Sequence, residues 1–171
     1  MMKQTDSKVA VEMYGPDGES KLISTGTDQL SYIRGRYGIV GRSTQVLRAK
    51  ISGDDSDGDY VLKISYPEEL RVPEHEMVAR ARDMTADKTY VLEHLPESVA
   101  SLDLPQHSTS AIRNALKVDK GSSSGRVLRI TAWKRLCPLT DLVGDELWKA
   151  FWECYRCESS LFPRLSILPS G

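Results

Sequence analysis

A lysine lies inside an apolar segment that has the texture of a β-strand. Lys63 stands in the run 60–64, which is rich in β-branched and aromatic residues. A strand does not bury an ammonium group without a partner. One role for Lys63 is a contact to the phosphates of a nucleotide, with a carboxylate holding the lysine in place. The other is a lysine on the exposed face of an edge strand, and the residue types alone leave both open.

Two glutamates follow in a predicted helix that opens at Pro73. Glu74 shares the apolar stripe of this helix, so we predict that Glu74 is the partner of Lys63. Glu76 lies four residues before Arg80, which predicts a surface ion pair instead. The alternative for Glu74 is an acid of the first turn that interacts favourably with the helix dipole.

A short loop between two predicted strands could contact phosphate and adenine. Its candidate residues are Val40, Gly41, Arg42, Ser43, Thr44 and Val46. Backbone N–H groups need small residues around them to approach a phosphate closely. One glycine and a serine, Gly41 and Ser43, do this less well than two glycines, and an ordinary hairpin turn is the alternative.

Metal chemistry is not predicted. Cys154 and Cys157 form a C-x-x-C pair in a predicted helix, but a zinc site needs four ligands and the remaining candidates are scattered. The acidic run 53–59 fails as a calcium loop, because Gly53 and Ile64 would stand at positions that require acids. We expect core or surface thiols and a solvated hairpin loop.

The elements that must position these residues are mainly strands. The predicted strands cover residues 9–13, 22–24, 37–40, 45–51, 60–64, 90–95 and 126–133. The predicted helices cover residues 73–84, 108–116 and 145–161, and residues 96–125 form a long connection. Strands grouped around one helix indicate an α+β fold. The last helix has a broad apolar stripe, which includes Leu147, Trp148, Phe151, Cys154, Tyr155 and Leu161.

Composition narrows the classes of function. The chain has 171 residues, of which 40% are hydrophobic and 27% charged, with a formal net charge of -1. The sequence lacks the clustered basic residues that are typical of a nucleic-acid-binding protein. No apolar run is long enough for a membrane span or a secretory signal. Three cysteines do not make an even disulfide framework. We therefore expect an intracellular protein, cytoplasmic or nuclear.

Several segments, taken in order, resemble the fungal-type (fungal-specific) protein kinase family. The resembling segments are Gly41–Thr44, Val61–Lys63, Pro73–Val78, His94–Pro96, Ile112–Arg113, Arg126–Ile130 and Leu136–Leu142. Each is weak alone, and together they cover roughly residues 34–162.

The resemblance implies a protein-kinase-like small lobe, an antiparallel sheet plus one helix, followed by the hinge and first helices of a truncated large lobe. Residues 1–30 would be a polar extension, 31–136 the small lobe and 137–171 the hinge and large-lobe helix. ATP would lie against the 40–46 loop, with Lys63 and Glu74 as the catalytic pair.

The sequence departs from the family in ways that affect activity. Ser43 replaces the second glycine of the loop, Glu158 stands where a histidine is expected, and no His-Arg-Asp or Asp-Phe-Gly motif occurs. We therefore expect a serine/threonine-kinase-like chain without kinase activity, with weak or absent ATP binding and no magnesium site. The alternative is a non-catalytic interaction module whose helix 145–161 binds a protein partner or a second copy. A gene-model fragment without a function of its own is a third possibility.

Overall fold

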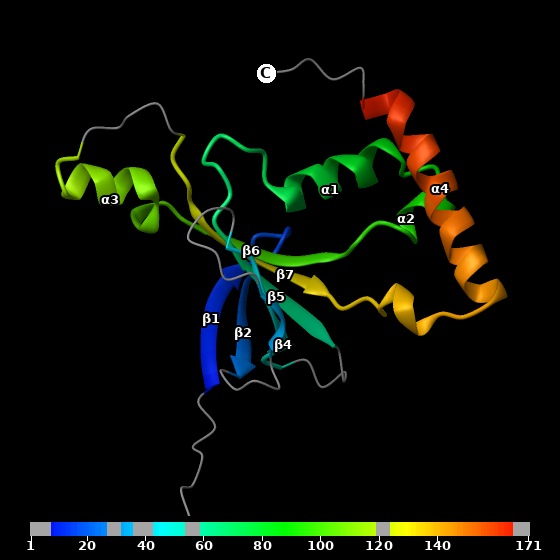
Figure 1. Cartoon of the computed structure of the whole chain (residues 1–171), viewed down its shortest axis with the longest axis horizontal. Coiled ribbons are helices and arrows are strands. Elements are labelled where there is room, and N and C mark those ends of the chain that lie inside the picture. Colours follow the sequence, from blue (N-terminus) through cyan, green and yellow to red (C-terminus); the bar gives the residue numbers. More distant parts are fainter. Residues whose placement is uncertain (1–7, 27–31, 36–42, 54–58, 119–123, 166–171) are drawn as a thin grey trace, which may run out of the picture. The chain divides into compact units, whose positions relative to one another are not determined.

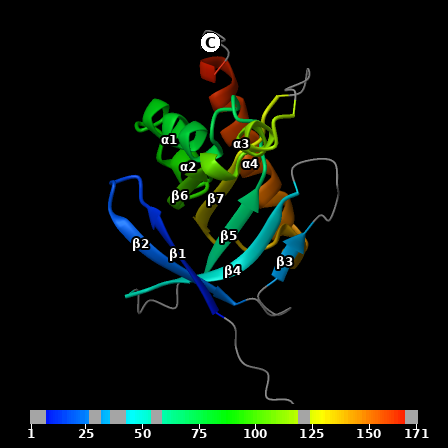
Figure 2. The ribbon, with the colours of Figure 1, turned by 90° about the vertical axis from the view of Figure 1, so that its left-hand side faces the viewer.

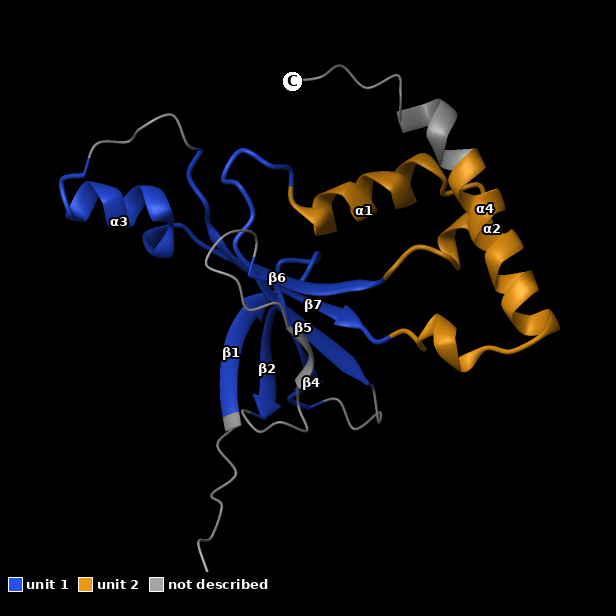
Figure 3. Cartoon of the chain, in the orientation of Figure 1, with its two compact units in different colours: residues 1–72, 97–135 blue, residues 73–96, 136–171 orange. Residues whose placement is uncertain are grey.

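The computed structural model describes residues 8–26, 32–35, 43–53, 59–118 and 124–165 (Figure 1). The strands are β1 (Lys8–Tyr14), β2 (Ser20–Gly26), β3 (Tyr32–Gly35), β4 (Gln45–Ile51), β5 (Tyr60–Ser65), β6 (Ser98–Leu104) and β7 (Leu128–Lys134). The helices are α1 (Glu74–Met84), α2 (Thr89–Leu92), α3 (Thr109–Ala115) and α4 (Asp145–Leu165), with short 3-10 turns η2 (Pro105–His107) and η3 (Leu139–Asp141). Figure 3 shows the two compact units of the chain, residues 1–72 with 97–135 and residues 73–96 with 136–171.

The first unit is an antiparallel sheet that closes on itself. Its strand order is β2-β1-β6-β7-β5-β4-β3, and β2 pairs a second time, with β4. Six strands therefore form a closed barrel, and β3 extends the row beside β4 (Figure 2). The N-terminal hairpin makes the closure, because Tyr14 of β1 meets Ser101 of β6 while Thr25 of β2 meets Ala49 of β4.

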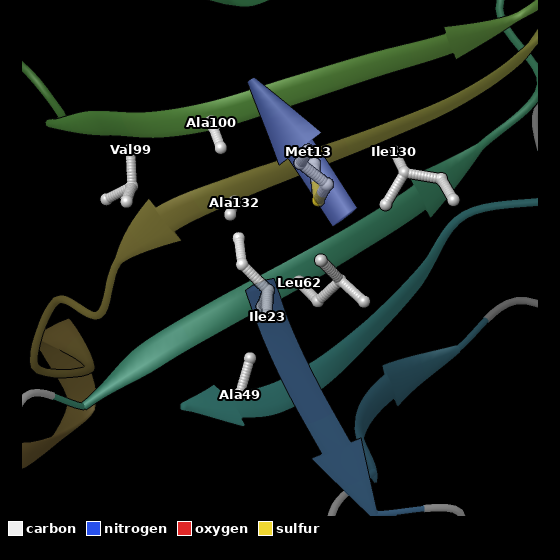
Figure 4. Close-up of a cluster of buried hydrophobic side chains, with 8 residues drawn as sticks. All are labelled: Met13, Ile23, Ala49, Leu62, Val99, Ala100, Ile130 and Ala132. Atoms are coloured by element: carbon white, nitrogen blue, oxygen red, sulfur yellow. The ribbon is translucent and has the colours of Figure 1, made fainter. Parts of the chain in front are cut away.

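Alternating residues of these strands fill the interior of the barrel. The buried cluster consists of Met13, Ile23, Ala49, Leu62, Val99, Ala100, Ile130 and Ala132. Figure 4 shows that these side chains come from the hairpin strands β1 and β2 and from β4, β5, β6 and β7. Met13 and Ile23 are fully buried, so the hairpin contributes directly to the core. Burying one side chain of this size stabilises the fold by about 1.5–3 kcal/mol.

The expected fold class is wrong. A kinase small lobe has an open sheet plus a helix. Here the N-terminal hairpin closes the sheet, because β1 pairs with β6 and β2 pairs with β4. The physical reason lies in the segments 9–13 and 22–24, which we expected as a hairpin within a polar extension. Val11 and Met13, two residues apart on β1, face the core together with Ile23 of β2, so one face of the hairpin enters the core although residues 1–30 are polar as a whole.

Two predicted segments also have a different structure. The predicted strand 90–95 instead begins within the helix α2. Just after this helix, Nδ1 of His94 lies 2.6 Å from the carbonyl oxygen of Tyr90. The predicted connection 96–125 contains β6, whose full length pairs with β7. The predicted strand 37–40 lies outside the described residues.

The second unit contains α1, α2, η3 and α4. The chain after α2 is anchored to α1 through Arg82, whose Nη2 donates to the carbonyl oxygens of Leu95 at 2.9 Å and Pro96 at 3.1 Å. Thr85 at the end of α1 is fully buried and donates its hydroxyl to the carbonyl oxygen of Ala81. The Thr85 hydroxyl thereby binds a carbonyl group in the last turn of α1, where backbone carbonyl groups run out of partners within the helix.

Candidate functional site

The sheet places two of the predicted nucleotide-contacting residues side by side. Lys63 of β5 lies directly opposite Val46 of β4 on one side and Thr131 of β7 on the other. Leu62 points into the barrel, so Lys63 belongs to the outer face. Lys63 is half-buried there, and Thr131 is buried. The pairing of Val46 with Lys63 could not be predicted from spacing, because it depends on the strand register.

The remaining residues of the predicted nucleotide site are only partly described. Val40, Gly41 and Arg42 lie outside the described residues. Ser43 has a φ of 44°, a left-handed conformation that favours glycine. The loop therefore demands glycine-like backbone where the sequence provides a serine, and Thr44 follows it into β4.

The predicted partner of Lys63 lies in the other unit. Glu74 is the first residue of α1 and is exposed, so its pairing with Lys63 stays a prediction. The predicted ion pair on the same helix is confirmed, because Arg80 Nη2 lies 3.8 Å from Glu76 Oε2. Both side chains are about half exposed, so this pair contributes little to stability.

The helix α4 presents two faces of different character. It begins after Gly144, whose φ is 57°, with Asp145 and Glu146 in its first turn, where acids favour the helix dipole. Its predicted existence is confirmed, and the structure extends it to Leu165. One face packs on α2, where the buried Cys157 lies 3.9 Å from the carbonyl oxygen of Val91.

Polar contacts complete the packing of α4 on α2. Glu153 Oε2 lies 3.4 Å from His94 Nε2, and its other oxygen lies 4.0 Å from Lys149 Nζ. The guanidinium carbon of Arg156 lies 5.4 Å from the ring centroid of Tyr90, which is cation–π geometry. These contacts fix the rotation of α4 about its own axis relative to α2.

That rotation turns an aromatic stripe toward solvent. Trp148 and Cys157 are nine residues apart, about two and a half turns, so they lie on opposite sides of the helix. The stripe, called here the aromatic face, consists of Trp148, Phe151, Trp152 and Tyr155, whose side chains are 72%, 59%, 59% and 55% exposed. The spacing i, i+3, i+4 and i+7 places them in one row.

The rings of the aromatic face support one another. Trp148 and Phe151 are edge to face, with centroids 6.3 Å apart and an interplanar angle of 86°. Trp152 and Tyr155 stack at 5.7 Å and 27°. Ring contacts of this kind restrict side-chain motion before any partner arrives, which lowers the entropic cost of binding.

Sequence reasoning found most of this face and missed its centre. The predicted apolar stripe of this helix contains Trp148, Phe151 and Tyr155, which belong to the aromatic face. It also contains Cys154, which does not belong to that face, and it omits Trp152, which does. The missed signal was available, because Trp152 lies four residues after Trp148 and three before Tyr155. The side chain of Leu161 lies outside those that the structure describes.

The described residues contain no group of three or more histidine, cysteine, aspartate or glutamate side chains that could hold a metal ion. Within the same residues, no helix combines the length and the apolar character that crossing a membrane requires.

No family model, curated protein or solved structure matches this chain. The resemblance to fungal-type kinases therefore stays a prediction, and the geometry of the described residues has to carry the functional argument.

Proposed function

We propose that this chain is a protein-interaction module that docks a protein on the aromatic face of α4. The observation that supports the proposal is a row of four aromatic side chains, each more than half exposed, turned away from the packing contact with α2. Single exposed apolar residues are common on protein surfaces, but a continuous row is typical of interaction sites. Tryptophan and tyrosine are also the residue types that most often dominate binding free energy.

The surroundings of the aromatic face fit a docking surface. Lys149 and Arg156 lie along one flank, and both already have intrachain contacts, with Glu153 and Tyr90. Charged residues at the rim of an apolar centre are the usual anatomy of a protein interface. We expect the rim to influence the association rate and the rings to determine the dissociation rate.

Photo-crosslinking in the expressing cell tests the proposal directly. Trp152 is replaced by a photoreactive phenylalanine analogue, and the same replacement at Leu70, which is 92% exposed in the first unit, is the matched control. We expect a discrete crosslinked species from position 152 that position 70 does not give. The crosslinked protein is then identified by mass spectrometry and purified.

Calorimetry with the purified partner decides whether the crosslink reflects binding. The wild-type chain should bind it, and the double change Trp148→Lys with Phe151→Glu should weaken binding by roughly thirtyfold or more, the effect of losing a dominant interface residue. Equal binding of the wild-type chain and the double variant would reject the aromatic face as the docking site.

A nucleotide contact at Lys63 is the second candidate function. The observation in its favour is the register that places Val46 beside Lys63, because an aliphatic side chain next to a lysine suits an adenine nucleotide. We expect ATP binding to be weak or absent in a calorimetric titration with and without magnesium. Tight, magnesium-dependent binding that Lys63→Met abolishes would favour this candidate over docking.

A further inference from the structure

We infer that the partner docked on the aromatic face is a second copy of this chain, with the two α4 helices antiparallel. The inference rests on the proposed docking function and identifies its partner. The resulting dimer would be isologous, with the same residues contributed by both copies around a two-fold axis.

The spacing of the rings is symmetric about the centre of the face. Phe151 and Trp152 are adjacent, and Trp148 and Tyr155 each lie three residues beyond them. A two-fold axis passing between Phe151 and Trp152 therefore brings Trp148 of one copy onto Tyr155 of the other, and Phe151 onto Trp152. Every ring meets a ring of the second copy, so no polar group is forced into the centre of the contact.

The size of the exposed face fits a dimer interface. An enclosed aromatic side chain buries 150–250 Å², so four that are more than half exposed offer on the order of 400–600 Å². The chain just before α4 adds further exposed apolar side chains, Leu136, Leu139 and Val143. A standard interface buries about 800 Å² on each partner, so this region can form one side of such an interface.

The flanking charges make the arrangement testable. In the antiparallel dimer each flank meets its own counterpart, so Lys149 of one copy lies near Arg156 of the other. These like charges oppose association weakly, and the charge of Lys149 is partly offset by its intrachain contact with Glu153. Added salt should therefore tighten the dimer, and Lys149→Glu should tighten it further at low salt by creating an opposite-charge pair.

Sedimentation velocity of the full chain across the micromolar range tests the inference. We expect a reversible, concentration-dependent change from monomer to dimer. Trp152→Glu should raise the dimer dissociation constant by roughly thirtyfold or more. Lys149→Glu should lower it by about twofold to fivefold. Leu70→Glu is the control, because Leu70 is an exposed apolar residue of the first unit. This change should leave the dimer dissociation constant unchanged.

The other outcomes distinguish failure of the dimer from failure of the docking function. A chain that stays monomeric at every concentration, with the thermal stability of Trp152→Glu unchanged, overturns the dimer and leaves docking to a different protein intact. Weaker association of Lys149→Glu overturns the antiparallel arrangement. Association beyond two copies overturns the closed two-fold contact. A Trp152→Glu monomer that loses stability shows that the face is packed within the monomer, which overturns both proposals.

Discussion

At the scale of single residues, the strongest charge contact joins two neighbouring strands. Arg129 of β7 is buried, and its Nε and Nη2 each donate to a different carboxylate oxygen of Asp103 on β6 at 2.7 Å. Two parallel bonds of this kind hold the guanidinium and the carboxylate in a fixed geometry and are stronger than bonds between neutral groups. A buried guanidinium without its carboxylate would carry the full cost of its lost hydration.

We predict that Asp103→Ala lowers the free energy of unfolding by about 3 kcal/mol, because it leaves the charge of Arg129 buried and unpaired. Asp103→Ala combined with Arg129→Met should cost less, since the stranded charge is then absent. Urea denaturation of the two variants and the wild-type chain gives the comparison. If the double variant is less stable than the single one, the account of the buried charge is wrong.

The three thiols should differ in reactivity. Burial raises the pKa of the Cys157 thiol, and the neighbouring Cys154 adds to the rise, whereas Cys137 and Cys154 are exposed. We predict that an alkylating reagent modifies Cys137 and Cys154 in the folded chain and reaches Cys157 after unfolding, because the thiolate is the reactive form. Mass spectrometry of labelled native and urea-unfolded protein measures this, and rapid native labelling of Cys157 would contradict it.

The same raised pKa has a consequence for stability. Its contribution is fully present below pH 9.0, the ordinary pKa of the thiol. Above that pH the unfolded chain releases the thiol proton before the folded chain does, so stability falls with rising pH. Cys157→Ala should remove this part of the alkaline dependence.

Residue-level predictions succeeded where the interaction is local in sequence. The pairing of Glu76 with Arg80 depends on residues four apart, a spacing at which helix geometry brings side chains together. The pairing of Asp103 with Arg129, 26 residues apart, was not predictable, because it requires the register between β6 and β7.

At the scale of elements, α3 shows how a short helix is held at its start. Ser108 is buried, and its hydroxyl accepts from the backbone N–H of Ala111 at 3.0 Å. Thr109 accepts from the N–H of Arg126 at 2.7 Å and donates its own N–H to the carbonyl oxygen of the same residue. The start of α3 is thereby joined to the chain that enters β7.

We predict that Ser108→Ala lowers the free energy of unfolding by about 1 kcal/mol, since it removes the acceptor for one N–H of the first turn. Ser108→Asp restores an acceptor for the N–H of Ala111 and should recover part of the loss. Ser110→Ala is the control, because Ser110 bonds Glu69 rather than the helix start. Thermal unfolding of the three variants provides the measurement, and equal effects of Ser108→Ala and Ser110→Ala would argue against a capping role.

Elements with clear periodicity were predictable, and short ones were not. The 21-residue helix α4 has a long, amphipathic pattern, so its type and start were predicted correctly. The run 90–95 is too short to tell strand from helix by pattern alone. Packing against α4 decides the outcome there, because Val91 is fully buried and contacts Cys157.

At the scale of the whole molecule, the N-terminal hairpin changes the class of the fold. The same order of strands and helix could have left an open sheet. Here β1 pairs with β6 at one edge and β2 pairs with β4 at the other, which closes the sheet. Closure depends on pairings between residues as distant as Thr25 with Ala49 and Tyr14 with Ser101. Composition and local pattern contain no signal for such pairings, so the sequence predicted β1, β2, β4, β5 and β7 but missed β3, β6 and the barrel.

In the second unit, the aromatic face of α4 is turned to solvent and the opposite face is packed on α2. The free energy of unfolding, measured in urea at a concentration where the chain is monomeric, tests this claim most directly. Trp148→Lys with Phe151→Glu changes the aromatic face, and Ala150→Lys with Cys157→Glu places the same charges on the face toward α2. The account predicts a change within about 0.5 kcal/mol for the first pair and a loss of several kcal/mol for the second. A loss of several kcal/mol in the first pair would contradict it.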